Sequence, residues 1–281
     1  MSNNSEKRKK KIIYNICMIV LICIFVCSGI YLGAYFWQTK RNEDKVNDLK
    51  KLIDYDSNVS ENHDNGDLSD ASGTDAVNNI EYVTIDGVDV QKKFKELYAK
   101  NHDFIGWLTI DGTDIDYPVM QSLDDEEYYL HRDFDKTYSY PGTLFIDTSS
   151  DVNAPSDNII IYGHHMQSGK MFGKLEDYAD KDYYENHRYV TFDTIYGDGT
   201  YEVIAAFYSK IYDKDYDGFK YYQFFDAYDK EQFDYYVSNC KALTSYDISE
   251  TAEYGDKLIS LSTCAYHTTN GRFVVVAKKI N

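Results

Sequence analysis

The chain has 281 residues, which is enough for one large domain or two small ones, and carries 47 acidic against 29 basic side chains. The formal net charge of −18 argues against general nucleic-acid binding, because affinity for phosphate comes from clustered lysine and arginine. Aromatic residues make up 16% of the chain and only three prolines are present, which excludes disorder over most of its length.

The amino-terminal segment predicts a membrane anchor. Residues 1–11 end in five consecutive basic side chains, and residues 12–37 contain no charged side chain. About 20 apolar residues span a bilayer, and the positive-inside rule retains the basic tail in the cytoplasm. A cleaved signal peptide is the alternative, but the apolar run is long for one and no clear A-x-A site follows it. We therefore expect a single-pass protein of the cell membrane, with the chain after Gln38 extracellular.

The next segment, residues 38–79, predicts a stalk and a linker. Apolar residues at helical spacing over residues 38–55 indicate a short helix. The rest of the segment is rich in Ser, Asn, Asp and Gly, which is typical of a flexible linker. The folded extracytoplasmic domain is therefore expected over residues 80–281.

This domain is predicted to be mainly β with peripheral helices. A helix is expected over roughly residues 89–100, and further helical patterns cover Glu126–Phe134, Met171–Tyr178 and Lys230–Leu243. Short strand patterns cover Phe104–Ile110, Ile115–Met120, Thr143–Asp147, Asn158–Tyr162, Tyr189–Phe192, Tyr201–Tyr208, Lys257–Thr263 and Arg272–Ala277. Many short strands with helices between them favour a closed or nearly closed mixed β-barrel, although the pattern does not give the strand pairing.

The five cysteines do not form a disulfide framework. Cys17, Cys23 and Cys27 lie in the apolar run, and Cys240 and Cys264 are not in a C-x-x-C pair, which excludes a zinc ribbon and a thioredoxin motif. A bridge between Cys240 and Cys264 remains open. Cys240 lies in a helical pattern, where we expect a small buried side chain.

Cys264 and Arg272 are candidates for chemistry. Residues 258–263 form a strand pattern that ends at Cys264, and a polar loop with Asn270-Gly271 leads into the strand that Arg272 opens. If the strands form a hairpin, the two side chains meet at one end of the sheet. An arginine there can favour thiolate or donate to an oxyanion. The alternative is a buried cysteine and a solvated arginine.

A nucleophilic cysteine needs a base, and His164 is the first candidate. It follows an apolar strand and Gly163, a position where catalytic side chains are commonly presented. His165, the adjacent residue, and His267, three residues after Cys264, are rivals. The others are not expected to act, namely His63 in the linker and His102, His131 and His187, which have no clear chemical neighbour in the sequence.

Three motifs, in this order, resemble those of sortases, and the class B branch most closely. They are Ile160–His165 followed by Met171–Leu175, then Leu261–Cys264, then Arg272 before a Val-rich strand. The family pattern is a Y-G-H segment, a T-L-x-T-C strand end and an arginine opening the next strand. Ser260 stands where the family often has Thr. The resemblance covers the chain from about residue 80 to residue 280.

The resemblance implies a sortase-type closed β-barrel preceded by N-terminal helices and a transmembrane helix. It implies a cysteine transpeptidase or peptidase of the hydrolase class, without cofactor or metal. Cys264 would be the nucleophile, His164 the general acid/base and Arg272 the oxyanion or substrate stabiliser. Ser262 and Thr263 would line the substrate groove.

The implied substrates are secreted proteins with a C-terminal sorting signal of the NPQTN or LPxTG type. The implied acceptor is an amine of lipid-linked peptidoglycan precursor. Two alternatives remain, a sortase that polymerises pilins on a lysine acceptor and a non-catalytic anchored adhesin.

One further motif, Asp213–Gly218, resembles the first half of an EF-hand loop. Phe224 stands at the twelfth position, where the bidentate glutamate would be, so a solvated acidic loop is expected instead. The surrounding Tyr-rich stretch, residues 212–228, is expected to pack on the barrel, with a wall- or sugar-binding surface as the alternative.

Overall fold

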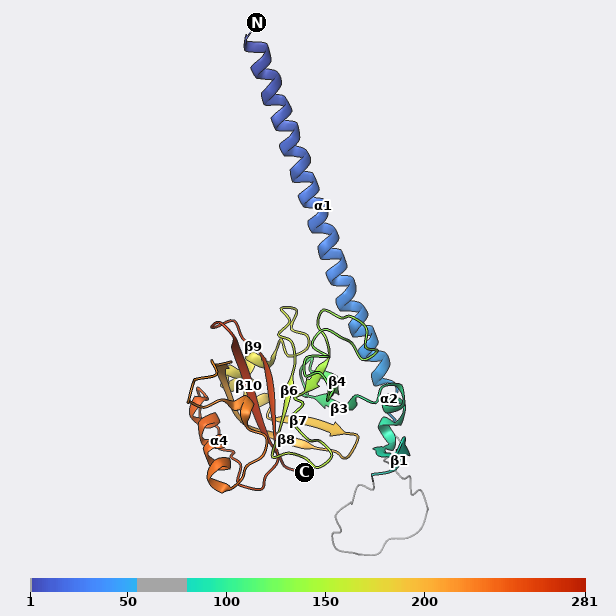
Figure 1. The fold of residues 1–281 in the computed structure, drawn as a ribbon, viewed down its shortest axis with the longest axis vertical. Coiled ribbons are helices and arrows are strands. Elements are labelled where there is room, and N and C mark those ends of the chain that lie inside the picture. Colours follow the sequence, from blue (N-terminus) through green and yellow to red (C-terminus); the bar gives the residue numbers. More distant parts are fainter. Residues whose placement is uncertain (1, 55–79) are drawn as a thin grey trace, which may run out of the picture. The chain divides into compact units, whose positions relative to one another are not determined.

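The computed structural model describes residues 2–54 and 80–281, so most of the predicted linker, with His63, lies outside the described residues. Helix α1 runs continuously over Ser2–Lys50 (Figure 1). Its stretch from Tyr14 is the one helix among the described residues that is long and apolar enough to cross a membrane. Its large apolar side chains between Tyr14 and Trp37 are exposed, which is compatible with a membrane anchor.

Contacts within the chain divide it between Lys45 and Val46. In the second unit, the apolar residues of the predicted stalk pack on a core cluster that contains Phe94, Leu97 and Trp107; they are Val46, Leu49, Leu52 and Ile53. The end of α1 is therefore held by apolar burial, the dominant favourable term in folding.

The predicted helix over residues 89–100 is only half right. Residues Tyr82–Ile85 (β1) and Val88–Gln91 (β2) form an antiparallel hairpin, followed by the 3₁₀-helix η2 (Lys92–Phe94) and helix α2 (Lys95–Lys100). Asp86 and Gly87 both have positive φ, the backbone of a tight hairpin turn. The Asp-Gly turn therefore sets the chain in a strand before the helix begins.

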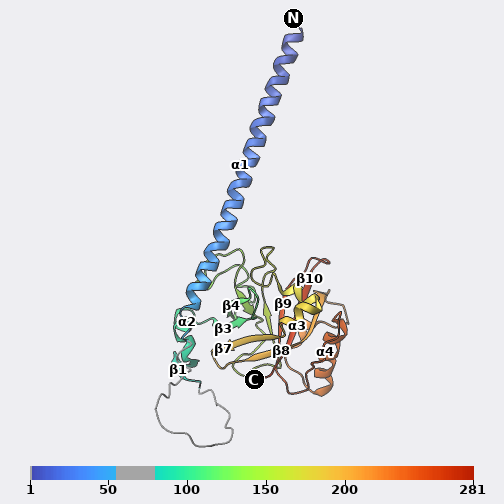
Figure 2. The same cartoon turned by 180° about the vertical axis from the view of Figure 1, so that it is seen from behind.

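Eight strands close into a barrel, which confirms the predicted fold class (Figures 1 and 2). The strands are β3 (Phe104–Thr109), β4 (Asp116–Met120), β5 (Leu144–Ile146), β6 (Asn158–Tyr162), β7 (Tyr189–Thr194), β8 (Thr200–Lys210), β9 (Leu258–Cys264) and β10 (Gly271–Lys279). Around the barrel they follow the order β10-β8-β7-β3-β4-β5-β6-β9. Every predicted strand is present, with ends that differ by no more than two residues.

The helical predictions have a mixed outcome. Helix α4 (Lys230–Leu243) has the predicted bounds and packs on β8, whereas α3 (Lys181–Asn186) was not predicted. Residues 126–134 form turns instead of a helix. The N–H groups of Tyr128 and Leu130 donate to carbonyls three residues earlier, and the Asp133 carboxylate then accepts from the N–H groups of Asp135 and Thr137. Of residues 171–178, only the part from Leu175 is helical, in the 3₁₀-helix η3 (Leu175–Ala179), since Met171 has a φ of 54°.

Candidate active site

Strand β9 places the candidate residues. It pairs parallel with β6, with Tyr162 opposite Ser262, and antiparallel with β10, with Cys264 opposite Arg272. Two further bonds join the ends of β6 and β9: the Gly163 N–H donates to the Ser262 carbonyl (3.1 Å), and the Thr263 hydroxyl donates to the Gly163 carbonyl (2.7 Å). The strand ends that present His164, Cys264 and Arg272 therefore lie at one end of the barrel.

The alternation of side chains along β9 places two serines on the same face as Cys264. Ser260, Ser262 and Cys264 share one face of the strand, because successive side chains point to opposite faces. Tyr236 of α4 shares a 2.8 Å hydrogen bond with the Ser260 hydroxyl, and Tyr221 shares a 2.7 Å bond with that of Ser262. Buried hydroxyls need such partners. The face that carries Cys264 is thus the one covered by α4 and the 3₁₀-helix η4 (Tyr221–Gln223).

Cys264 is a free, half-buried thiol, and Cys240 is free and fully buried. A bridge between them, left open by the sequence, is therefore wrong. The expectation that Cys240 is a small buried residue is confirmed. Burial raises the pKa of the Cys240 thiol far above its usual range, so this thiol remains protonated and inert.

His164 is half-buried directly after β6, and Gly163 before it allows a close approach. A Cβ atom on Gly163 would lie 2.4 Å from Leu144 Cδ2 and 2.6 Å from Phe172 Cδ2. Nε2 of His164 lies 2.9 Å from the Leu130 carbonyl oxygen. Since a carbonyl only accepts, Nε2 carries a proton and Nδ1 is the basic nitrogen of the neutral ring.

Burial lowers the pKa of His164, the carbonyl of Leu130 opposes this, and neighbouring His131 adds to the lowering. Among the described residues, no hydrogen bond joins His164 to Cys264. Catalytic hydrogen bonds are often long in ligand-free enzymes and tighten when substrate binds.

Arg272 is half-buried at the start of β10. Its Nη1 donates to the carbonyls of Gly271 (3.0 Å) and Asn270 (3.4 Å). These bonds hold the guanidinium at the strand end. Nε and Nη2 take no part in them, so they are the donors that could turn to an oxyanion.

Ser262 and Thr263 are both buried, with 1% and 2% of their surface exposed. Their hydroxyls are engaged with Tyr221 and with the Gly163 carbonyl, and their part in substrate binding stays a prediction. Tyr221 was not identified from the sequence. Burial raises its pKa to about 12, and Ser262 and Arg272 moderate the shift. Tyr221 therefore remains a neutral hydroxyl behind Ser262.

The rival histidines have other contacts. His165 Nδ1 lies 2.9 Å from the carbonyl oxygen of Cys264 and 3.5 Å from the Glu176 carboxylate. His267 is exposed, and its ring lies 4.8 Å from that of Tyr208. His165 thus contacts the backbone of Cys264, a contact that the sequence does not reveal.

The acidic loop at Asp213–Asp217 is an exposed turn, and the rings of Tyr212 and Tyr216 stack across it at 4.0 Å. Within residues 11–54 and 80–281, no group of three or more His, Cys, Asp or Glu side chains is placed to hold a metal ion. Two members of the Tyr-rich stretch, Tyr221 and Phe224, pack in a core cluster with α4.

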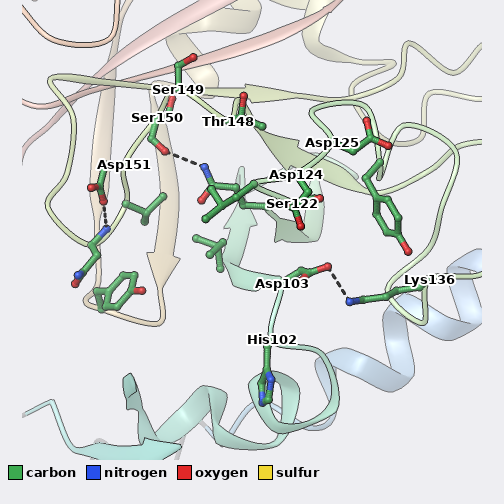
Figure 3. Close-up of a pocket in the computed structure, with 17 residues that line it drawn as sticks. His102, Asp103, Ser122, Asp124, Asp125, Lys136, Thr148, Ser149, Ser150 and Asp151 are labelled. Carbon is green, nitrogen blue, oxygen red and sulfur yellow. Dashed lines mark hydrogen bonds and ion pairs between the residues drawn. The ribbon is translucent and has the colours of Figure 1, made fainter. Parts of the chain in front are cut away.

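Figure 3 shows a pocket of about 950 Å³. The strand pairings place it at the end of the barrel opposite to Cys264. It is lined by the residues before β3 and those after β4, β5 and β7, with Asp103 and Lys136 joined in a 2.9 Å ion pair. The five predicted site residues, all within the described chain, do not line it. This pocket and the candidate site residues are therefore separate.

The sortase domain family model matches residues 108–280. Sortase B of Staphylococcus aureus is 33% identical over 198 residues, covering 68% of this chain and 76% of that protein. Sortase B of Listeria monocytogenes is 29% identical over 265 residues, covering 93% and 94%. The structure of a Staphylococcus aureus sortase B–substrate complex is 31% identical with a TM-score of 0.62, covering 68% of this chain and 86% of that one. Sortase B complexed with triglycine is 31% identical with a TM-score of 0.60, covering 67% and 86%.

We expect Gly163→Ala to damage the site, because the added methyl group overlaps Leu144 and Phe172. Overpacking should lower the free energy of unfolding by about 1–3 kcal/mol and displace His164. Gly197→Ala is the matched control, since nothing lies within 4 Å of its added Cβ. Thermal unfolding of both variants measures the difference. Equal stability of the two proteins would contradict the close approach at Gly163.

Proposed function

Because this chain belongs to the sortase family and to its class B branch, we propose that Cys264, His164 and Arg272 perform its transpeptidase chemistry. The family makes the protein a cysteine transpeptidase. The observation that carries the assignment is the double pairing of β9, which brings Cys264 opposite Arg272 and beside the strand end that leads to His164.

The reaction begins with the thiolate of Cys264 attacking the scissile carbonyl carbon of a sorting signal. The carbonyl oxygen becomes an oxyanion, for which Arg272 supplies N–H donors. The C–N bond then breaks, the His164 imidazolium gives its proton to the leaving amine, and a thioester remains on Cys264. An acceptor amine attacks the thioester, loses a proton to His164, and releases the thiolate with a new amide bond.

The lowered pKa of His164 bears on the rate. Free cysteine has a pKa near 8.5 and histidine near 6.5, so the thiolate–imidazolium pair is already a minor form. Burial of His164 makes the imidazolium rarer still. We therefore expect a slow enzyme whose turnover is limited by this small active population.

The proposed substrates are secreted proteins with a C-terminal sorting signal of the NPQTN or LPxTG type. The proposed acceptor is an amine of lipid-linked peptidoglycan precursor, and a related sortase B has been crystallised with triglycine, which bears a free amine. Ser262 and Thr263 remain the proposed substrate-binding residues. They lie on opposite faces of β9, where their hydroxyls are hydrogen-bonded to Tyr221 and to the Gly163 carbonyl.

Cys264→Ala should abolish both peptide cleavage and thioester capture. The measurement is mass spectrometry of labelled sorting peptides incubated with the ectodomain, with and without an amine acceptor. Cys240→Ala is the matched control and should keep most activity, because Cys240 is buried in the core. Amine-dependent product supports transpeptidation, and no cleavage of any peptide by the folded wild-type protein would favour the adhesin alternative.

Arg272→Lys separates two roles of the guanidinium. Lysine keeps the charge but loses the planar fork of N–H donors. If the fork stabilises an oxyanion, the variant should fold normally and lose roughly 10²–10³-fold in kcat. Fluorogenic peptide kinetics with a thermal melt tests this. Near-wild-type turnover would leave charge alone as the contribution of Arg272.

We also propose that α1 anchors the protein in the cell membrane with its basic end in the cytoplasm. The apolar stretch from Tyr14 and the basic residues before it support this orientation through the positive-inside rule. The barrel would then lie on the outer side of the membrane, where the proposed secreted substrates and lipid-linked acceptor would reach it.

The anchor predicts that the protein fractionates with membranes and that protease added to intact cells removes the barrel domain. Immunoblotting with an antibody against residues 80–281 gives the readout. A soluble mature form that begins near residue 38 would instead identify a cleaved signal peptide.

A further inference from the structure

The segment that holds His164 carries a second imidazole. His131 follows Leu130, whose carbonyl accepts from His164 Nε2, and the rings of His131 and His164 stack with centroids 5.1 Å apart and planes at 29°. His131 lies far from His164 in the sequence, and no sequence motif marks it. One short segment thus contacts the candidate base twice, through a backbone acceptor and through a ring.

The His131 ring is itself held in place. Its Nδ1 lies 3.2 Å from the Tyr140 carbonyl oxygen, and the rings of Tyr138 and Tyr140 flank it at 6.4 Å. The Ser139 N–H donates to the His131 carbonyl at 3.0 Å. Since Nδ1 donates to a carbonyl, Nε2 is the nitrogen of His131 that takes up a proton.

The segment that carries Leu130 and His131 is held in place by further hydrogen bonds. Buried Tyr129 accepts a hydrogen bond from Asn101 and donates one to Asp103, and the Thr143 N–H donates to the Tyr129 carbonyl. Gly142 has a φ of 60°, and a Cβ on it would lie 2.2 Å from the Leu130 carbonyl oxygen. Glycine at this position therefore leaves the Leu130 carbonyl free to receive His164.

We infer that His131 is a positioning residue for His164, holding its ring by stacking and, when protonated, opposing the formation of the His164 imidazolium. This rests on the proposed role of His164. Two cations at this separation repel, so a positive charge on His131 disfavours the charged form of His164 and lowers its pKa. The active thiolate–imidazolium population would then depend on a residue outside the proposed set of Cys264, His164 and Arg272.

Other ionisable groups lie on the elements packed around His164. They are Arg132, Tyr138 and Tyr140 on the same segment as His131, Cys264 and Arg272 on the strands, and Tyr162, His165 and Glu176 nearby in the fold. Of these, only His165 belongs to a residue type whose ordinary pKa lies between about 5 and 8. It lies 3.5 Å from the Glu176 carboxylate and is bonded to the Cys264 carbonyl. A test must therefore resolve the His164 signal itself.

The test compares His131→Phe, which keeps a ring and removes the charge, with His131→Ala, which removes both. NMR titration of ¹³C-labelled histidines follows His164 directly, and kcat/KM is measured from about pH 5 to 9, the range in which histidine titrates. In His131→Phe we expect His164 to titrate with a higher pKa. The acidic limb of the kcat/KM profile should then move to higher pH, and the maximum of kcat/KM should equal or exceed that of the wild type. In His131→Ala we expect kcat to fall about 10- to 100-fold, because the base is misplaced.

His102→Phe is the control. Like His131, His102 is exposed and its ring lies close to an aromatic ring, that of Tyr98 at 4.9 Å. It lies away from His164, however, among the residues that line the pocket of about 950 Å³. The His102→Phe variant should change neither the His164 titration nor the pH profile of kcat/KM. An unaltered His164 titration in His131→Phe together with unaltered kcat in His131→Ala would overturn the inference. The NMR titration needs no turnover, so it separates this outcome from failure of the proposed function. That failure would appear as a wild-type protein without activity, or as a Cys264→Ala variant that keeps wild-type activity.

Discussion

Strand β9 pairs on both sides, parallel with β6 and antiparallel with β10, and the rest of the site depends on this arrangement. The antiparallel register sets Cys264 against Arg272. The parallel register brings the end of β6, and hence His164, to the same level of the barrel. A slip by one residue in either ladder would turn Cys264 to the opposite face of the sheet. Closure of the barrel fixes both registers at once.

The face of β9 that carries Cys264 also carries two serines, and both serine hydroxyls form hydrogen bonds. Ser260 and Ser262 bond to Tyr236 and Tyr221, which come from the long connection between β8 and β9. Helix α4 therefore does more than cover apolar surface, because it supplies a hydroxyl that the strand requires. Unpaired buried hydroxyls would be costly, so the strand and its cover specify each other.

The candidate nucleophile and the candidate base lie in contrasting surroundings. Cys264 is a free thiol at the strand end, whereas Cys240 is sealed in the core on the buried face of α4. His164 is hydrogen-bonded through Nε2 to the Leu130 carbonyl, and its ring stacks on that of His131. Position, more than residue type, thus distinguishes Cys264 from Cys240.

The sequence by itself determined the anchor-like apolar run, all eight barrel strands, the bounds of α4 and the identities of the candidate residues, because each depends on local periodicity or a contiguous motif. It misplaced helices at residues 89–91 and 126–134, where the structure has a hairpin with an Asp-Gly turn and a series of three-residue turns. The Leu130 carbonyl, His131 and Tyr221 came only from the tertiary structure. They reach the site from segments distant in the chain, and a single sequence does not reveal which loops will meet when a barrel closes.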